Sequence, residues 1–137
     1  MYRTPIQIRF NDVDLMGHVN NAVIMEYFDL GKSNYFAEAG LPPESGDFTV
    51  MIVHFEVDFH QQMHSRDEIA VETRTARFGT KSLHIEQQVV RKEADGSWTP
   101  CATCHTVMAG YSRKLQQSAP VPEEVKEQIR QFDAKNE

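Results

Sequence analysis

The chain has 137 residues, of which 40% are hydrophobic and 25% are charged, and its formal net charge is −6. This length predicts one domain over residues 1–137, with a core that needs no disulfide or metal. The acidic balance excludes a uniformly basic surface for nucleic acid. Because no stretch resembles a signal peptide or a membrane span, we expect a cytoplasmic protein whose two cysteines are free thiols.

The first third of the chain predicts one strand, one polar turn and one long helix. Residues 6–10 alternate apolar and polar side chains, which indicates a strand, and residues 11–18 form a polar turn. The pattern of residues 21–39 predicts a helix with so narrow a polar stripe that it is largely buried. The residues that begin and end this helix are Asn20 or Asn21 at its start, and Gly40, Pro42 and Pro43 after it.

The rest of the chain predicts strands and one short helix. The strands are expected over residues 48–59, 69–78, 82–91 and 101–111. A short helix follows Pro120, with an apolar face made by Val125, Ile129 and Phe132. Consecutive strands with short connections favour an antiparallel sheet. The fold class is therefore α+β: a curved antiparallel sheet of five to six strands around one long central helix.

The densest polar cluster covers residues 11–21, between the first strand and the long helix. One interpretation is a turn and a helix cap, because Asp and Asn favour both. A calcium loop is a poor match, because Met16 and Val23 stand where an EF-hand places ligands. A third interpretation is catalytic: the helix start offers free N–H groups to an oxyanion, next to a carboxylate. Spacing alone does not choose between Asp12 and Asp14 as that carboxylate.

The run from Arg9 to Asn21, with its Asp-x-Asp-x-x-Gly-His-Val-Asn-Asn core, and the aromatic helix after it resemble a known family. Over nearly its whole length the chain resembles the hotdog-fold 4-hydroxybenzoyl-CoA thioesterases, which act on acyl-CoA. The resemblance implies that Asp14 is catalytic, that an N–H of Asn21 or a neighbour is the oxyanion donor, and that His18 and Asn20 shape the site. It also implies homodimers joined through sheet edges, often paired into homotetramers, with sites at the dimer interface.

This resemblance predicts hydrolysis of an acyl-CoA substrate to free acid and CoA. Asp14 would act either as general base on water or as nucleophile, and no metal or other cofactor is required. The chain departs from many family members at Ile24, Asp29 and Lys32, which bears on the choice of acyl group. Alternatives are hydrolysis of a thioester carried by acyl carrier protein, and a non-catalytic module that binds acyl-CoA.

Three further groups of side chains carry weaker signals. The residues expected near the CoA phosphates are Arg77, Lys81, Ser82 and Arg91. Residues 101–105 match the C-x-x-C-H pattern of haem attachment but lie within a predicted strand, so we interpret the cysteines as strand residues. His54, His60 and His64 lack a recurring metal-ligand spacing, and alternation places the first two on a solvated or interface face.

Overall fold

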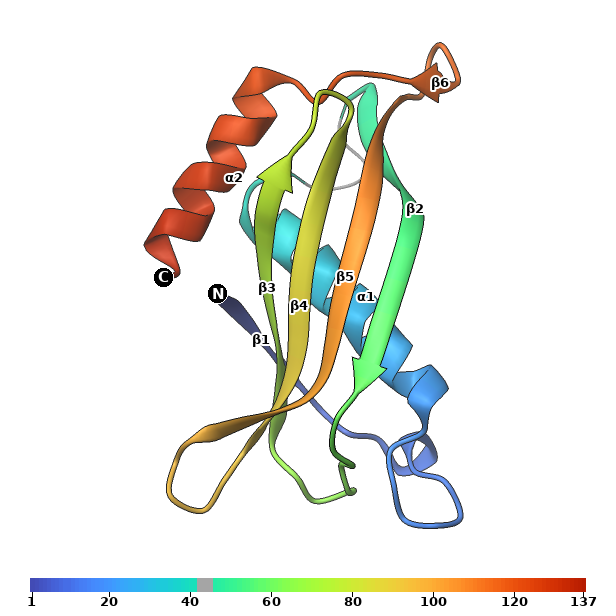
Figure 1. Ribbon diagram of the computed structural model, residues 1–137, viewed down its shortest axis with the longest axis vertical. Coiled ribbons are helices and arrows are strands. Elements are labelled where there is room, and N and C mark those ends of the chain that lie inside the picture. Colours follow the sequence, from blue (N-terminus) through green and yellow to red (C-terminus); the bar gives the residue numbers. More distant parts are fainter. Residues whose placement is uncertain (42–45) are drawn as a thin grey trace.

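The computed structural model describes residues 1–41 and 46–137, which form a single sheet and two helices (Figure 1). In chain order the elements are β1 (Tyr2–Ile6), a 3₁₀ turn (Phe10–Asp12), α1 (Asn21–Glu38), β2 (Phe48–Phe59), β3 (Ile69–Phe78), β4 (Ser82–Lys92), β5 (Trp98–Ser112), β6 (Gln117–Ser118) and α2 (Glu123–Lys135). The predicted α+β fold is confirmed, and the four long strands fall where the alternation placed them.

The sheet is antiparallel, and its strands lie in the order β1-β3-β4-β5-β2. The short strand β6 pairs with the end of β5. Helix α1 crosses one face of the sheet, and α2 lies beside β3 (Figure 1). β2 is an edge strand, and its middle exposes Met51, Ile52 and Val53. A long apolar edge of this kind is available for pairing with another chain.

The core lies between α1 and the inner face of the sheet. Phe28 of α1 is fully buried, as are Val71 and Val89 of the facing strands. At the other end of the helix the hydroxyl of Tyr35 lies 2.9 Å from Thr75 Oγ1 and donates to Asp133 Oδ1 over 2.8 Å, which ties α1 to β3 and α2. Neither described helix is long and apolar enough to cross a bilayer.

Gly31 allows α1 to lie against β3. A Cβ on Gly31 would lie 2.6 Å from Val71 Cγ1, inside van der Waals contact. We therefore expect Gly31→Ala to lower the free energy of unfolding by about 1–2 kcal/mol, since crowding outweighs the gain in helix propensity. Urea denaturation measures this, with the exposed Ser33→Ala as control. A Gly31→Ala protein as stable as wild type would contradict the close approach.

The first strand differs from the sequence prediction. The first strand covers Tyr2–Ile6 rather than residues 6–10, because its pairing with β3 ends where Ile6 meets Ile69, the first residue of β3. Phe10 instead begins the 3₁₀ turn, and its side chain is 95% exposed. Helix α1 ends at Glu38, followed by Gly40 with φ +85°, as predicted. Pro42 and Pro43 lie outside the described residues.

Candidate active site

The start of α1 presents an unused hydrogen-bond donor. Asn20 caps the helix, because its side chain accepts from the Ala22 N–H over 2.8 Å and its carbonyl accepts from Val23 and Ile24. Among the described residues nothing accepts from the N–H of Asn21. That N–H stands at the positive end of the helix dipole, so it is suited to hold an oxyanion.

The cap has a measurable contribution to stability. Replacing Asn20 by Ala removes the acceptor of the Ala22 N–H, so we expect the free energy of unfolding to fall by about 1 kcal/mol. Asn20→Asp keeps an oxygen at the same place and should cost much less. Urea denaturation midpoints of the two variants measure the difference. Equal midpoints for Asn20→Ala and wild type would show that the side chain does not hold the helix start.

Asp14 begins the turn of a short hairpin before the helix, closed by a bridge between Val13 and Val19. Gly17 makes the turn possible with φ +83°, a value that favours glycine. Asp14 Oδ1 accepts from the N–H groups of Met16 at 2.9 Å and His18 at 3.2 Å. No described residue donates to Oδ2. The turn thus fixes the carboxylate through one oxygen and leaves the other available.

Asp12 has a different environment, although it is only two positions away. Its side chain is 2% exposed and accepts from the Tyr27 hydroxyl over 2.6 Å and from the Arg9 N–H over 2.9 Å. Burial alone would raise the pKa of Asp12, but the hydrogen bonds from Tyr27 and Arg9 outweigh it and leave that pKa below its usual value. Asp12 is therefore a buried structural carboxylate that joins the turn to α1.

A cavity of about 530 Å³ lies at the start of α1. Its wall combines three parts of the chain: the Asp14 hairpin, the first turn of α1, and the segment after β2. Its lining residues are Asp14, Met16, His18, Val19, Asn20, Asn21, Ile24, Phe59, His60, Gln61, Gln62 and Met63. The cavity thus brings together the four residues predicted to form the catalytic part of the site, Asp14, His18, Asn20 and Asn21.

His18 joins the hairpin to the segment after β2. Its imidazole packs edge-on against that of His64, with 5.1 Å between ring centroids, and a β-bridge links the two backbones. His64 in turn lies 3.7 Å from Asp67 Oδ2 through Nδ1. The half-buried His18 therefore shapes the cavity and contacts a second imidazole that the sequence patterns did not connect with it.

A second depression, of about 560 Å³, lies on the outer face of the sheet, away from the helix start. Its walls include Glu56, Glu86 and His105, and no free helix N-terminus opens into it. His54 and His60 are exposed, as predicted for the outer alternation of β2. In residues 1–41 and 46–137, no three His, Cys, Asp or Glu side chains gather closely enough to hold a metal ion.

A model of the thioesterase-like superfamily matches residues 8–129, which is most of the chain and includes the whole hairpin and cavity. The chain belongs to this superfamily. It is therefore a thioesterase-family protein of the hotdog fold. The family resemblance of the run from Arg9 to Asn21 is confirmed. Family and neighbours together support thioester hydrolysis as its chemistry.

Solved structures of thioesterases agree with this assignment, and one further relative matches most of the chain. A thioesterase from Thermus thermophilus, crystallised with coenzyme A and Zn, is 32% identical, with 96% of this chain and 94% of that one covered and a TM-score of 0.79. A 4-hydroxybenzoyl CoA thioesterase shares the fold at 21% identity, with 93% and 97% covered and a TM-score of 0.84. YsmA from Bacillus subtilis is 23% identical over 90% of this chain and 82% of its own length.

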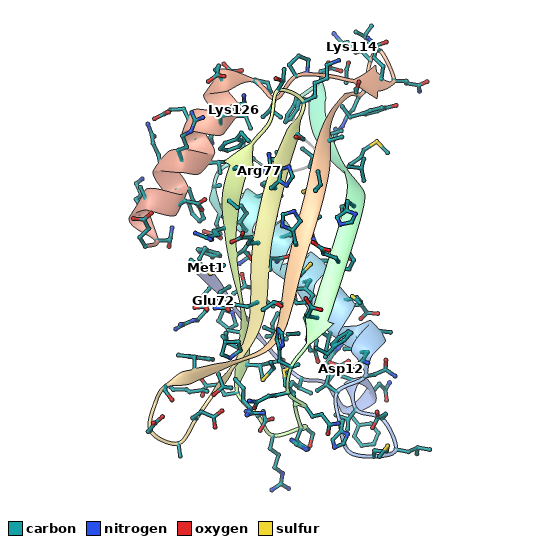
Figure 2. The ribbon with its side chains drawn as sticks, in the orientation of Figure 1. Met1, Asp12, Glu72, Arg77, Lys114 and Lys126 are labelled. Carbon is teal, nitrogen blue, oxygen red and sulfur yellow. The ribbon has the colours of Figure 1, made fainter. Side chains whose placement is uncertain are left out.

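The basic residues predicted near the CoA phosphates do not gather at this thioesterase-family cavity. Arg77, Lys81 and Ser82 lie around the turn between β3 and β4, at the opposite end of the sheet from Asp12 and the cavity (Figure 2). At about 3.3 Å per residue, these strands separate the turn from the cavity end by roughly 25 Å. Within one chain these three residues therefore lie far from Asp14.

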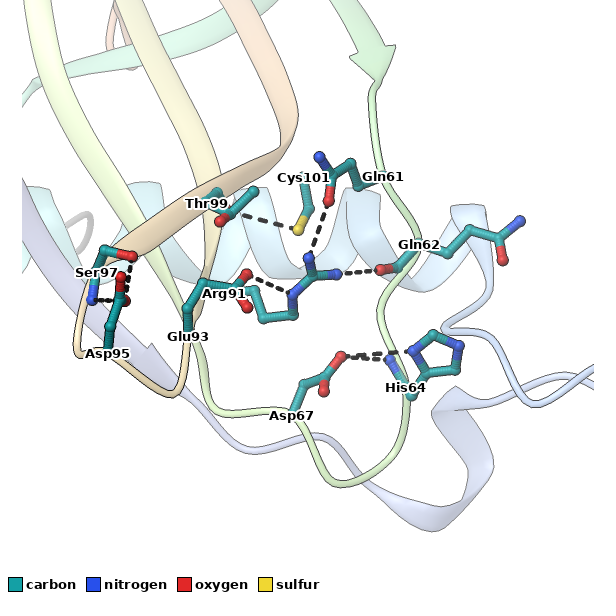
Figure 3. Close-up of polar contacts among 10 residues, drawn as sticks. All are labelled: Gln61, Gln62, His64, Asp67, Arg91, Glu93, Asp95, Ser97, Thr99 and Cys101. Carbon is teal, nitrogen blue, oxygen red and sulfur yellow. Dashed lines mark hydrogen bonds and ion pairs between the residues drawn. The ribbon is translucent and has the colours of Figure 1, made fainter.

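Arg91 lies at the cavity end of β4, but it is occupied by protein partners (Figure 3). Its Nη1 donates to the Gln62 carbonyl over 2.7 Å, its Nη2 to Gln61 Oε1 over 2.9 Å, and its Nε to Glu93 over 3.0 Å. The prediction that Arg91 contacts CoA is not supported by this geometry. Its guanidinium contacts Gln61 and Gln62, which form part of the cavity wall.

The three residues at which the chain departs from the family pattern, Ile24, Asp29 and Lys32, lie in different environments. Ile24 lines the cavity. Lys32 is buried against the sheet, where its ammonium lies 3.4 Å from Gln87 Oε1 and 3.3 Å from the exposed Asp29. Of these three residues, Ile24 is therefore the one that lines the cavity.

Sequence reasoning missed the wall formed by residues 59–63. This segment carries no catalytic motif, and it enters the site because β2 ends beside the start of α1. Val19 fixes the junction, because its N–H donates to the Met63 carbonyl over 2.8 Å. The polar density of His60, Gln61 and Gln62 between two apolar strands was the available signal, but it does not distinguish a site from a surface loop.

Proposed function

We propose that this protein hydrolyses an acyl-CoA thioester to a free acid and CoA, with Asp14 as the catalytic carboxylate. The observation that carries the proposal is the cavity at the start of α1. It contains both a carboxylate with an unoccupied oxygen and, on Asn21, a helix N–H without a partner among the described residues.

The helix start suits the charge that develops in the reaction. As a nucleophile attacks the thioester carbonyl, negative charge moves onto its oxygen, and a donor held in place beforehand stabilises that charge. The N–H of Asn21 is such a donor, since the Asn20 cap fixes the first turn without using it. The positive end of the α1 dipole contributes in the same direction.

Asp14 supplies the attack in one of two ways. As general base, its free Oδ2 removes a proton from water, the resulting hydroxide adds to the carbonyl carbon, and the C–S bond then breaks to release CoA as thiolate. As nucleophile, Oδ2 itself adds to that carbon, CoA leaves as thiolate, and water then cleaves the mixed anhydride. The leaving thiol has a pKa of roughly 8.5 by analogy with cysteine, so its departure needs little help from an acid.

The choice of CoA as carrier rests on two observations. The Thermus thermophilus thioesterase, 32% identical to this chain, was crystallised with coenzyme A. The net charge of −6 disfavours docking of an acyl carrier protein, which is an acidic partner. We therefore propose CoA as the carrier for this chain as well. We also propose a cytoplasmic location, with which the two free, buried cysteines agree.

We further propose that the working form is a homodimer, or a homotetramer built from it, paired through the β2 edges. The exposed Met51, Ile52 and Val53 supply an apolar edge for this contact. If the two β2 strands pair antiparallel, the β3–β4 turn of one copy lies at the cavity end of the other. That arrangement gives Arg77 and Lys81 a route to the phosphates of a CoA bound across the interface.

The test is hydrolysis of a panel of acyl-CoAs, with released thiol detected by a disulfide dye. The panel holds benzoyl, short-chain, medium-chain and long-chain thioesters, each also prepared on acyl carrier protein. We expect turnover of at least one CoA ester, and the preferred member names the acyl group. Turnover of the carrier-protein esters alone would show that the carrier is acyl carrier protein and not CoA. Tight acyl-CoA binding without any turnover would instead make the protein a non-catalytic binding module.

A further inference from the structure

One wall of the cavity is a segment without regular secondary structure. Residues 59–63 line the cavity, and four of them lie after the end of β2. A first anchor joins the segment to β5, because the N–H groups of His60 and Gln61 both donate to the Cys101 carbonyl, at 2.8 Å and 3.1 Å. A loop in this position needs further contacts to hold one conformation beside a reacting group.

Arg91 supplies the main side-chain anchor of this wall (Figure 3). Its guanidinium donates to the Gln62 carbonyl and to the Gln61 side chain, while Glu93 accepts from its Nε. Only 19% of the Arg91 side chain is exposed. The planar fork of Arg bridges two neighbouring residues of the wall, which the single ammonium of Lys does not reproduce.

The wall is connected to the catalytic hairpin. Met63 is buried, and its carbonyl accepts from the Val19 N–H over 2.8 Å. His18, the neighbour of Val19, donates its own N–H to Asp14 Oδ1 over 3.2 Å. A displacement of residues 61–63 therefore reaches the carboxylate through two hydrogen bonds.

We propose that Arg91 is a positioning residue of the active site. It fixes the wall at Gln61 and Gln62, and through Met63 and Val19 it fixes the backbone that orients Asp14. Arg91 does not line the cavity, so it acts through these residues and not on the substrate. The inference rests on the proposed thioester hydrolysis, and it replaces the expectation that Arg91 binds a CoA phosphate.

The test compares two substrates that carry the same acyl group, one on CoA and one on N-acetylcysteamine, which lacks the nucleotide and its phosphates. For Arg91→Met we expect kcat to fall by about 10- to 100-fold on both substrates, with little change in KM, because Asp14 is misplaced. The matched control is Lys92→Met, which removes an exposed cation on the neighbouring residue of β4 and should leave both rates unchanged. A loss confined to the CoA ester, mainly in KM, would overturn the proposal in favour of phosphate binding.

A second variant separates the same two roles. Lysine is a good phosphate binder but lacks the fork, so Arg91→Lys should lose as much kcat as Arg91→Met if the residue positions the wall. Wild-type rates in Arg91→Lys would overturn the proposal.

Hydrogen exchange provides a readout that needs no activity. The amide of Val19 should exchange at least about 10-fold faster in Arg91→Met than in wild type, while amides in the centre of β4 stay protected. Unchanged protection at Val19 would overturn the positioning role even if wild type hydrolyses none of the thioesters offered. If wild type shows no turnover but the Val19 amide exchanges faster in Arg91→Met, the proposed function is rejected, while the link from Arg91 to the Asp14 hairpin is kept.

Discussion

Asp14→Asn is expected to lower kcat by about 10²- to 10⁴-fold on the preferred thioester, with little change in KM. The amide keeps an oxygen that accepts from Met16 and His18, so the hairpin should keep its shape. It carries no negative charge, and it neither removes a proton from water nor attacks the carbonyl. The measurement is steady-state release of thiol, with circular dichroism and urea denaturation to show that the variant folds.

A matched control for this variant is Asp58→Asn. Asp58 is an exposed carboxylate on the outer face of β2, and it lines the second depression and not the cavity at α1. The same chemical change there should leave kcat within about twofold of wild type. Comparable rates for Asp14→Asn and Asp58→Asn would remove Asp14 from the mechanism.

The buried carboxylate of Asp12 is expected to stabilise the fold. Replacing Asp12 by Ala leaves the buried Tyr27 hydroxyl and the Arg9 N–H without their acceptor. We expect the free energy of unfolding at pH 7 to fall by about 2–3 kcal/mol, which is the cost of unpaired buried donors. Tyr27→Phe removes one partner of the same carboxylate and should cost about 1 kcal/mol. Urea denaturation of the three proteins measures both values.

The contribution of Asp12 to the free energy of unfolding should also depend on pH. The hydrogen bonds to Asp12 keep its pKa below the usual value in the folded protein, against the raising effect of burial. The contribution of the ionised carboxylate is therefore complete above the unfolded pKa, about 3.9, and is lost as the pH falls through the folded value. The stability difference between wild type and Asp12→Ala should stay constant from about pH 5 to 8 and shrink below about pH 4. A difference that grows on acidification would contradict this assignment.

Much of the fold follows from local pattern. The alternation of residues 82–91 matches β4, because buried and partly buried residues alternate along that strand. The helix was predictable because its cap and its terminal glycine flank a segment with apolar and polar residues at helical spacing. The strand predicted over residues 6–10 was wrong. The end of β1 is set by the residue at which its partner β3 begins, and the alternation of side chains holds no information on that partner.

The site was predictable only in part. The motif located the hairpin, but the different environments of Asp12 and Asp14 depend on Tyr27, which reaches the first carboxylate from α1. Likewise Arg91 meets Gln61 and Gln62 only because the end of β4 lies beside the segment after β2. These contacts join residues that are far apart in the chain, and charge and spacing alone assigned Arg91 to a phosphate. In the proposed dimer, the positions of Arg77 and Lys81 relative to the substrate depend on a second copy, which no single-chain pattern describes.

The most direct test of the proposed mechanism is a single-turnover experiment on the preferred acyl-CoA, with enzyme in excess, in wild type and in Asp14→Asn. Wild type should release one thiol per thioester in a fast phase, while Asp14→Asn should bind the thioester and retain it intact. Calorimetry should give similar dissociation constants for the two proteins. Release of thiol by Asp14→Asn at the wild-type rate would show that the Asp14 carboxylate does not perform the reaction.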